Sequence, residues 1–454
     1  MDRYSDALLT DLYELTMAQG YWCSGVTGVA TFSLFFRGYP RNRSYYIFAG
    51  LEDILDYLER FRFTAEDMEY LRNLSRFDDE FLDFLGELRF TGDVRAMPEG
   101  TICFADEPVL EVRAPIIEAQ IVETYLLNQA TFQSTVATKA SRVVHAAQGR
   151  SVADFAARRT HGTDAAMKVA RAGYLVGYNA TSNVRAGATY GIPVVGTMAH
   201  SFIMAFDSEI EAFRAFTHAF PDYATLLVDT YDTLRGVRNA IEVGHEIARQ
   251  GHVLRGVRID SGDLALLGSE ARRMLDEAGL PDVGVFASGG LDEYEVDRLV
   301  RERTPIEGYG VGTKAGVSAD APYLDSAYKL VEYASRPVLK LSSKKQSLAG
   351  CKQVFRITAR GGWYERDVIA LLGEEPPARS AQPLLEEVMV EGSRQASQPS
   401  LNEIRDAAAR GFARLPSRYK ALTNAPHYSV ELSPRLKELQ REVAREVRDR
   451  ELGE

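Results

Sequence analysis

The chain has 454 residues, which is more than one compact domain usually contains. A hydrophobic content of 45% and a charged content of 26% are typical of an ordinary globular protein. The net charge of −11, from 53 basic and 64 acidic residues, disfavours nucleic acid or an anionic membrane as the main partner, although a local basic cleft could still bind an anionic substrate.

The cysteines indicate a reducing compartment, and the apolar runs indicate neither a secretion signal nor a membrane helix. The N-terminal stretch is interrupted by charges and lacks the cationic start and apolar core of a secretion signal. No run approaches the ~18 uninterrupted apolar residues of a membrane helix. Cys23, Cys103 and Cys351 lie far apart and form no Cys-x-x-Cys pair, which disfavours disulfides or a structural zinc site. We therefore expect a cytoplasmic protein with reduced thiols, no zinc and no membrane partner.

Residues 1–148 mix helical and β patterns, which predicts an α+β domain. Apolar residues at helical spacing predict helices over 6–25, 51–61 and 116–148. Aromatic and β-branched runs predict strands over 29–40, 46–49 and parts of 92–114.

From about residue 149 the pattern changes to short apolar runs that alternate with helical stretches. The strand candidates are Ser151–Phe155, Tyr174–Tyr178, Pro193–Val195, Thr225–Val228, Gly256–Ile259, Gly284–Ala287 and Gly308–Val311. The helical patterns between them cover 207–219, 232–250, 263–279 and 291–301. Seven or so βα units in series favour a parallel α/β barrel over an open sheet, and we place this domain at 149–335.

The last part of the chain, 336–454, returns to mixed patterns. Runs with β character cover 329–333, 338–342 and 353–358. The lysine- and serine-rich segment 341–350 is typical of an exposed loop, and 433–450 is typical of a charged, solvated helix.

Residues that follow the strands of a parallel barrel meet at one mouth, where such folds bind their ligands. The strand ends of this chain carry polar, charged or glycine residues that include Arg158, Ser182, Thr197, His200, Asp229, Arg258, Asp260, Asp263, Gly289, Gly290, Gly312 and Thr313. One mouth would thus combine arginines, carboxylates, glycine-rich turns and a histidine, which suits a phosphorylated sugar or nucleotide with Mg²⁺.

The histidine follows the run Ile192–Val195, which is bounded by glycine and is typical of a buried parallel strand. The end of this run delivers Thr197, His200 and Ser201 within five residues. From this stretch alone, a catalytic histidine and a core or capping histidine are equally good interpretations.

Two glycine-rich turns are candidate phosphate sites. Ser288-Gly289-Gly290 and Gly310-Val311-Gly312-Thr313 each follow a strand and are expected to open a helix, where free N–H groups and the helix dipole favour an anion. Taken alone, such a glycine pair is more often a plain connection than a phosphate site.

Arginines and carboxylates complete the candidate site. Arg258 and Asp260 alternate onto one face of their strand. Asp263 could join Asp260 around Mg²⁺, which usually takes one or two carboxylates together with substrate phosphates, or it could cap a helix. Arg158 and Arg159 suit diphosphate recognition but could also be a solvated pair.

Taken together, these motifs resemble nicotinate phosphoribosyltransferase. The resemblance rests on TDLYELTMAQGYW (10–22), ADFAARR (153–159), GYNATSNV (177–184), GTMAHSF (196–202), VRIDSGDL (257–264) and GVGT (310–313), which follow the family's order along essentially the whole chain. It implies an irregular parallel α/β barrel of the type II phosphoribosyltransferase kind, with a second α+β domain built from the N- and C-terminal segments. It also implies a homodimer with shared active sites.

The implied reaction joins nicotinate to 5-phosphoribosyl 1-diphosphate and gives nicotinate mononucleotide and diphosphate, in NAD biosynthesis or salvage. ATP is the implied co-substrate, Mg²⁺ the implied ion, and a phosphohistidine the implied intermediate of a ligase-class enzyme. By matched motif, His200 would accept the phosphate, since a neutral imidazole nitrogen is available near pH 7.

The resemblance also assigns roles to the other residues. Asp229 would orient the imidazole, Thr197 and Arg258 would hold nicotinate, and Tyr13 would stack on nicotinate from the partner subunit. The remaining residues would bind 5-phosphoribosyl 1-diphosphate and Mg²⁺: Arg158, Ser182, Asp260, Asp263, Gly289, Gly290, Gly312 and Thr313.

Three alternatives remain open from the sequence. The first is a nicotinamide phosphoribosyltransferase, because the related amide enzymes also use an arginine at this point. The second is a non-catalytic nucleotide-binding barrel, which the presence of both His200 and Asp260 disfavours. The third concerns the phosphate acceptor, for which His161 is the rival because it too follows a barrel strand. The chain departs from some short members of the family in lacking a C-terminal zinc-binding cysteine cluster.

Overall fold

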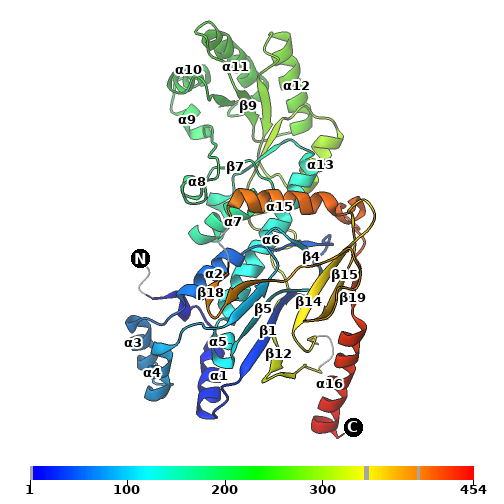
Figure 1. Cartoon of the computed structure of the whole chain (residues 1–454). Helices are drawn as coiled ribbons and strands as arrows, with labels where there is room; N and C mark the ends of the chain where they lie inside the picture. The colour runs from blue at the N-terminus through cyan, green and yellow to red at the C-terminus, as the bar shows by residue number, and fades with distance from the viewer. Residues whose placement is uncertain (1–3, 342–346, 396–398, 454) are drawn as a thin grey trace. The chain divides into compact units, whose positions relative to one another are not determined.

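The computed structural model describes residues 4–341, 347–395 and 399–453. The chain divides into two compact units (Figure 1). The terminal unit combines Met1–Thr138 with Tyr323–Glu454, and the central unit is Lys139–Pro322. The boundaries predicted from the sequence lie about ten residues later than these. The observed boundary after Thr138 falls inside a continuous helix, α6 (Glu123–Ala147), so no helix-breaking residue marks it in the sequence.

The central unit is built on a parallel sheet in the order β7-β6-β11-β10-β9-β8. Its strands are β6 (Ser151–Asp154), β7 (Ala180–Thr181), β8 (Thr225–Leu227), β9 (Gly256–Ile259), β10 (Gly284–Ala287) and β11 (Gly308–Val311). The runs Gly256–Ile259, Gly284–Ala287 and Gly308–Val311 are the predicted ones without change, because each is short, mostly apolar and largely buried, with Arg258 as the charged exception.

Helices alternate with these strands, as the βα pattern predicted. They are η2 (Ala157–Arg159), α7 (Thr163–Leu175), α8 (Val184–Tyr190), α9 (His200–Met204), α10 (Glu209–Ala219), α11 (Thr233–Ala248), α12 (Leu264–Glu277), α13 (Glu293–Arg301) and α14 (Thr313–Gly316). α11 and α12 pack against each other and against β9 (Figure 1). Asp232 caps α11 by accepting the N–H of Arg235 at 2.8 Å, which fixes where this helix begins.

Two of the predicted strands are wrong. Tyr174 and Leu175 end α7, and Gly177 (φ +123°) turns the chain after it, so the strand forms later at Ala180–Thr181. Val194 makes only an isolated parallel bridge to Thr181, and Val194 and Val195 are 48% and 41% exposed. The run ending at Val195 lies beside β7, an edge of the sheet, and in the part of the chain that the structure describes no further strand pairs with it.

The terminal unit contains a large antiparallel sheet in the order β13-β12-β1-β5-β3-β17-β18. Its strands are β1 (Val29–Phe36), β3 (Asp93–Ala96), β5 (Pro108–Pro115), β12 (Ser326–Tyr333), β13 (Arg336–Pro337), β17 (Glu386–Val390) and β18 (Ser393–Arg394). The antiparallel pairing of β1 with β12 joins the two ends of the chain in one sheet. Phe32 of β1 stacks on Tyr328 of β12 with the ring centroids 4.8 Å apart, which adds aromatic contact across this junction.

Smaller sheets and helices complete the terminal unit. The other strands are β2 (Tyr46–Ile47), β4 (Ile102–Cys103), β14 (Lys352–Thr358), β15 (Tyr364–Leu371), β16 (Ala381–Pro383) and β19 (Val430–Leu432). The helices are η1 (Asp6–Leu8), α1 (Leu12–Cys23), α2 (Leu51–Arg60), α3 (Ala65–Asn73), α4 (Asp79–Glu87), α5 (Ile116–Ile121), the first part of α6, α15 (Leu401–Arg414), η3 (Ser417–Lys420) and α16 (Pro434–Leu452). The β run predicted at 338–342 is replaced by β13 at Arg336–Pro337. The predicted loop 341–350 falls partly outside the described residues.

These features confirm the expected fold class. A curled parallel α/β sheet with alternating helices forms one unit, and the N- and C-terminal segments together form an α+β unit. Among the described residues, no helix is both long enough and apolar enough to cross a membrane.

Candidate active site

A cavity of about 640 Å³ lies on the concave side of the parallel sheet. Its walls come from strands at both edges and from the segment after β7, so the sheet curls around it. The lining residues that matter here are Phe155, Thr197, Arg258, Phe286 and Gly310. This is the size and the mixture of aromatic and polar lining that small-ligand sites usually have.

Glycines on the strands make room for the two aromatic rings of this cavity. A Cβ on Gly310 would lie 2.4 Å from the Phe155 ring, and a Cβ on Gly256 would lie 2.5 Å from the Phe286 ring. Both distances are well inside van der Waals contact. The rings can therefore lie flat against the sheet only where the strands carry no side chain.

Two arginines, Arg255 and Arg258, line the cavity, and Arg258 is the one that contacts Thr197. Its Nη1 donates to Thr197 Oγ1 at 2.6 Å and its Nη2 donates to the carbonyl of Met198 at 3.0 Å. Its guanidinium carbon lies 5.9 Å from the centroid of the Phe155 ring. Nε is buried and has no hydrogen-bond partner in the described part of the chain. The structure thus brings Thr197 and Arg258 together, as the two motifs had suggested.

The electrostatics of Arg258 combine burial with neighbouring charges of both signs. Burial lowers the pKa of the Arg258 guanidinium, and the repulsion from Arg158 acts in the same direction, while Asp260 and Asp229 oppose the shift. An anionic ligand would add a further favourable charge at a position where water no longer solvates the cation.

His200 is the first residue of α9 and is half-buried. Its Nδ1 lies 3.1 Å from the hydroxyl oxygen of Thr230, which directly follows Asp229. The partner that the structure gives the imidazole is therefore Thr230, whereas the sequence suggested Asp229. His161, the rival phosphate acceptor, is exposed in the turn before α7.

Asp229 instead fastens the loop after β9. Its Oδ2 accepts the N–H of Asp260 at 3.0 Å and the hydroxyl of Ser261 at 2.6 Å. Its Oδ1 is buried without a partner among the described residues. Asp260 in turn accepts the hydroxyl of Ser288 at 2.5 Å, so one chain of hydrogen bonds links the loops that follow β8, β9 and β10.

Gly289 allows the last two of these loops to touch. It has φ +87°, and a Cβ there would lie 1.8 Å from the carbonyl oxygen of Asp260. The prediction that Ser288-Gly289-Gly290 opens a helix is wrong, because α13 begins three residues later and Asp292 already caps it. Gly289 is required by the contact between the two loops, whereas a Cβ on Gly290 would meet no atom within 4 Å. The N-terminus of α13 lies beyond this turn and does not point its free N–H groups at Gly290.

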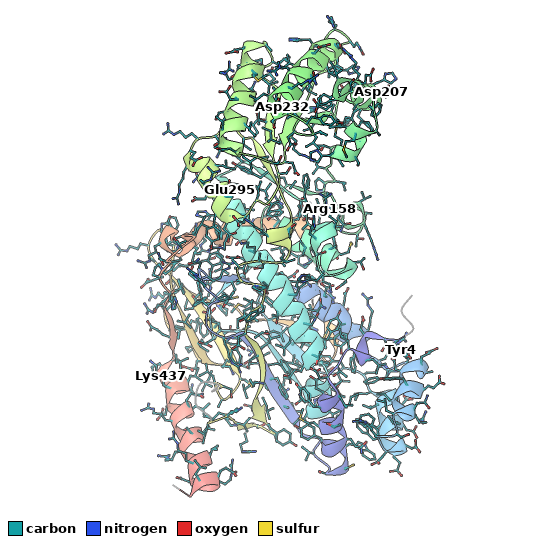
Figure 2. The ribbon with its side chains drawn as sticks, turned by 180° about the vertical axis from the view of Figure 1, so that it is seen from behind. Tyr4, Arg158, Asp207, Asp232, Glu295 and Lys437 are labelled. Atoms are coloured by element: carbon teal, nitrogen blue, oxygen red, sulfur yellow. The ribbon has the colours of Figure 1, made fainter. Side chains whose placement is uncertain are left out.

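The remaining predicted residues lie at the same carboxyl ends of strands. Figure 2 labels Arg158, which is exposed in η2 directly after β6. Ser182 is exposed after β7, and its N–H donates to the carbonyl of Asp154 at 2.8 Å. Gly312 precedes the single-turn helix α14, whose first residue is Thr313. These residues thus lie at the ends of three neighbouring strands, because β6 pairs with both β7 and β11.

Asp263 is the N-cap of α12. Its Oδ1 accepts the N–H groups of Ala265 and Leu266 at 3.1 and 3.2 Å, which is the capping alternative that the sequence left open.

Tyr13 lies in the terminal unit, on α1, and is 48% exposed. The next residue, Glu14, is fully buried and accepts hydrogen bonds from the hydroxyls of Thr10 and Thr124. Burial raises the pKa of the Glu14 carboxyl to about 7, with the two hydroxyls opposing the shift. These contacts tie the start of α1 to the start of α6. The Tyr13 ring is partly exposed, and its hydroxyl is hydrogen-bonded to the Glu123 carboxyl at the start of α6.

The residues present are compatible with Mg²⁺. In the described part of the chain, no group of three or more His, Cys, Asp or Glu side chains can hold a metal by itself. Magnesium needs fewer protein ligands when phosphate oxygens complete its shell. The unpartnered Oδ1 of Asp229, next to the loop of Asp260, is a buried carboxylate oxygen that a cation would satisfy.

Sequence reasoning assigned no role to the side chains of Phe155, Thr230 and Ser288, although it included Ser288 in a candidate phosphate turn. A signal for Phe155 exists, since it alternates with Ala153 and Ser151 on one face of β6, where two small residues followed by an aromatic one indicate a cavity wall. Thr230 directly follows the predicted carboxylate Asp229, and Ser288 begins the predicted glycine turn. The sequence does not indicate which contacts their hydroxyl groups make.

Comparison with known proteins decides the family. Residues 8–130 match the model of the nicotinate phosphoribosyltransferase N-terminal domain, residues 150–353 match that of the nicotinate phosphoribosyltransferase family, and residues 378–440 match that of its C-terminal domain. The chain belongs to the nicotinate phosphoribosyltransferase family.

Individual nicotinate phosphoribosyltransferases resemble the chain over nearly its whole length. One from Mycobacterium tuberculosis is 50% identical over 432 residues, which cover 95% of this chain and 92% of the relative. One from Bacillus subtilis is 38% identical, with 94% and 93% covered. The crystal structure of human nicotinic acid phosphoribosyltransferase superimposes with a TM-score of 0.87 at 29% identity, covering 96% of this chain and 99% of the human one.

Proposed function

We propose that this chain transfers the phosphoribosyl group of 5-phosphoribosyl 1-diphosphate to nicotinate, in NAD biosynthesis, and that ATP hydrolysis is linked to the transfer. The family assignment supports the first part. The observation that carries it is Arg258, a buried guanidinium held by Thr197 and Met198 against the Phe155 ring. A planar cation beside an aromatic face suits a flat aromatic ring that bears a carboxylate.

In this reaction the bond between ribose C1 and the diphosphate oxygen breaks, and the pyridine nitrogen forms a new bond to C1. The transition state resembles an oxocarbenium ion leaving diphosphate, so stabilisation of the leaving charge is the main task. We assign the binding of 5-phosphoribosyl 1-diphosphate to Arg158, Ser182, Asp260, Gly289, Gly290, Gly312 and Thr313. Bound Mg²⁺ would neutralise charge on the diphosphate, and Asp260 and Asp263 are the residues that we propose hold it, with Asp263 also committed to its cap.

For the ATP step we propose His200 as the phosphate acceptor. When Nδ1 carries the proton and donates it to Thr230, the lone pair lies on Nε2, which can attack the terminal phosphorus of ATP. The phosphorus–nitrogen bond forms as the bond to the ADP oxygen breaks, and water later hydrolyses the phosphohistidine to inorganic phosphate. This would place the protein among the ATP-dependent, ligase-class enzymes.

We further propose that the protein acts in the cytoplasm as a homodimer. In this arrangement Tyr13 of one copy stacks on nicotinate in the central unit of the other. The exposure of Tyr13 and the buried contacts of Glu14 beside it support a ring that is held out for a ligand.

A product assay tests the reaction directly. The protein is given 5-phosphoribosyl 1-diphosphate and Mg²⁺ with nicotinate or with nicotinamide, each with and without ATP. We expect nicotinate mononucleotide from nicotinate, with more product when ATP is present. If only nicotinamide gave a mononucleotide, the substrate assignment would be overturned, and if neither did, the transferase assignment itself would fail.

A further inference from the structure

A buried carboxyl group lies directly behind two of the loops assigned to substrate binding. Asp154 is the last residue of β6 and is 2% exposed. Its Oδ1 accepts the N–H of Ala156 at 2.8 Å, and its Oδ2 accepts the hydroxyl of Thr181 at 2.7 Å. One carboxyl oxygen therefore holds the loop after β6, and the other holds Thr181, the last residue of β7, after which the next loop begins.

Both contacts continue toward residues of the candidate site. Ala156 immediately precedes η2, the turn that carries Arg158, and its carbonyl accepts the N–H of Arg159 at 2.7 Å. On the other side, the Thr181 hydroxyl also accepts the N–H of Asn183 at 3.0 Å. Ser182, between these two residues, donates its N–H to the Asp154 carbonyl at 2.8 Å.

Burying this carboxyl group costs the fold free energy. Burial raises the pKa of the Asp154 carboxyl, and the groups that favour its charged form are the Thr181 hydroxyl and the Ala156 N–H rather than a cation. An apolar residue would avoid the desolvation cost but could not hold two loops at once. Such unfavourable buried groups are concentrated at functional sites.

We propose that Asp154 is a positioning residue that fixes the turn of Arg158 and the turn of Ser182 relative to one another, so that both meet the phosphate groups of 5-phosphoribosyl 1-diphosphate. This inference rests on the proposed function, because it takes the substrate roles of Arg158 and Ser182 from it. Asp154 does not touch the substrate in this account. Its effect is to preorganise two loops that would otherwise have to be ordered when the substrate binds.

The test uses substitutions that keep shape and change hydrogen bonding. In Asp154→Asn the amide can accept from only one of the two donors, and in Thr181→Val the hydroxyl is lost at nearly constant volume. For each we expect the KM for 5-phosphoribosyl 1-diphosphate to rise about tenfold, the effect of one hydrogen bond to a charged group, while the KM for nicotinate stays within about twofold of wild type. Thr181→Ser keeps the hydroxyl and should restore the wild-type KM.

Thr217→Val is the matched control. Thr217 is a buried threonine of the same unit, and its hydroxyl donates to the carbonyl of Phe213 within α10. It should leave both KM values unchanged, and melting temperatures of all variants show whether each one folds. If Asp154→Asn does not fold, Thr181→Val carries the test.

The outcomes separate this inference from the proposed function. An inactive wild-type protein would contradict the function. An active wild type whose KM for 5-phosphoribosyl 1-diphosphate is unchanged in both variants would overturn the positioning role, whatever happens to kcat. An equal rise of both KM values would overturn it as well, since it would show a general loss of the cavity rather than of the two phosphate loops.

Discussion

Arg258 is fixed before any ligand arrives. Two of its guanidinium nitrogens are bound to Thr197 and Met198, and the ring of Phe155 lies alongside. The conformational entropy of this side chain is therefore already lost before a carboxylate binds, so binding does not have to order the guanidinium. Lysine cannot reproduce this, because an ammonium is a compact, strongly hydrated charge without a planar fork.

We therefore expect Arg258→Lys to raise the KM for nicotinate by at least about tenfold, although the charge is kept. Steady-state kinetics with nicotinate varied at saturating 5-phosphoribosyl 1-diphosphate provide the measurement. Arg255→Lys is the control, since Arg255 lines the same cavity but is bound at Nε to the carbonyl of Asp222. Equal KM values for wild type and Arg258→Lys would exclude this arginine as the carboxylate receptor.

The phosphate acceptor is a second single-residue question, because the chain offers two histidines. We expect His200→Ala to abolish ATP hydrolysis and the acid-labile labelling of the protein by ATP labelled at the terminal phosphate, because no nucleophile remains beside Thr230. His161→Ala should label normally, since the exposed His161 lies outside this contact. Labelling that survives in His200→Ala and disappears in His161→Ala would move the acceptor to His161.

At the scale of elements, the loops after β8, β9 and β10 form one connected structure. Asp229 holds the Asp260 backbone, Asp260 holds the Ser288 hydroxyl, and Gly289 packs against the Asp260 carbonyl. A change in one loop should therefore alter the position of the others.

Gly289→Ala tests this connection. The new Cβ would have to displace the Asp260 carbonyl, which we expect to lower the melting temperature and to raise the KM for 5-phosphoribosyl 1-diphosphate. Gly279→Ala is the matched control, since Gly279 of the same unit also has a positive φ of +75° but no atom within 4 Å of its added Cβ, and it has no assigned role in substrate binding. It should cost only the roughly 1 kcal/mol of a left-handed alanine. Similar losses in both variants would show that backbone conformation alone, and not the contact with Asp260, requires glycine at 289.

The strands show how much of this fold could be predicted. β9, β10 and β11 are central in the sheet. Their short runs are mostly apolar, with Arg258 of β9 as the charged exception, and can be recognised in the sequence because both faces of the sheet are covered. The run Tyr174–Tyr178 has a similar apolar pattern, but its first two residues end α7. A short apolar segment alone does not distinguish a strand from the end of a helix. The run at Pro193–Val195 failed because its position at a sheet edge depends on distant strands.

The site shows the same division. Placement of Arg258, within β9, and of Asp260, directly after it, followed from the rule that strand ends meet at one edge. The same rule placed Thr197 at the site, although the strand predicted before it forms only an isolated bridge. The partner of His200 did not follow, because the choice between Asp229 and its neighbour Thr230 depends on how the chain turns after β8. Side chains that contact through such a turn cannot be identified from spacing alone.

At the scale of the whole molecule, the proposed dimer makes a quantitative prediction. Tyr13 belongs to the terminal unit and His200 to the central unit. If each site takes Tyr13 from one copy and His200 from the other, Tyr13→Ala and His200→Ala damage different copies of every site. A heterodimer of the two variants then contains one intact site and one site with both defects.

We therefore expect activity to return when the two inactive variants are unfolded, mixed in equal amounts and refolded. Random pairing makes half of the dimers heterodimers, and half of their sites are intact, so the mixture should reach about a quarter of wild-type activity. Arg258→Ala mixed with His200→Ala is the control. Both residues belong to the same central unit, so every site of that heterodimer keeps one defect and the mixture should stay inactive. Recovery in the control, or none in the Tyr13 mixture when size-exclusion chromatography shows dimers, would place Tyr13 outside the partner's site.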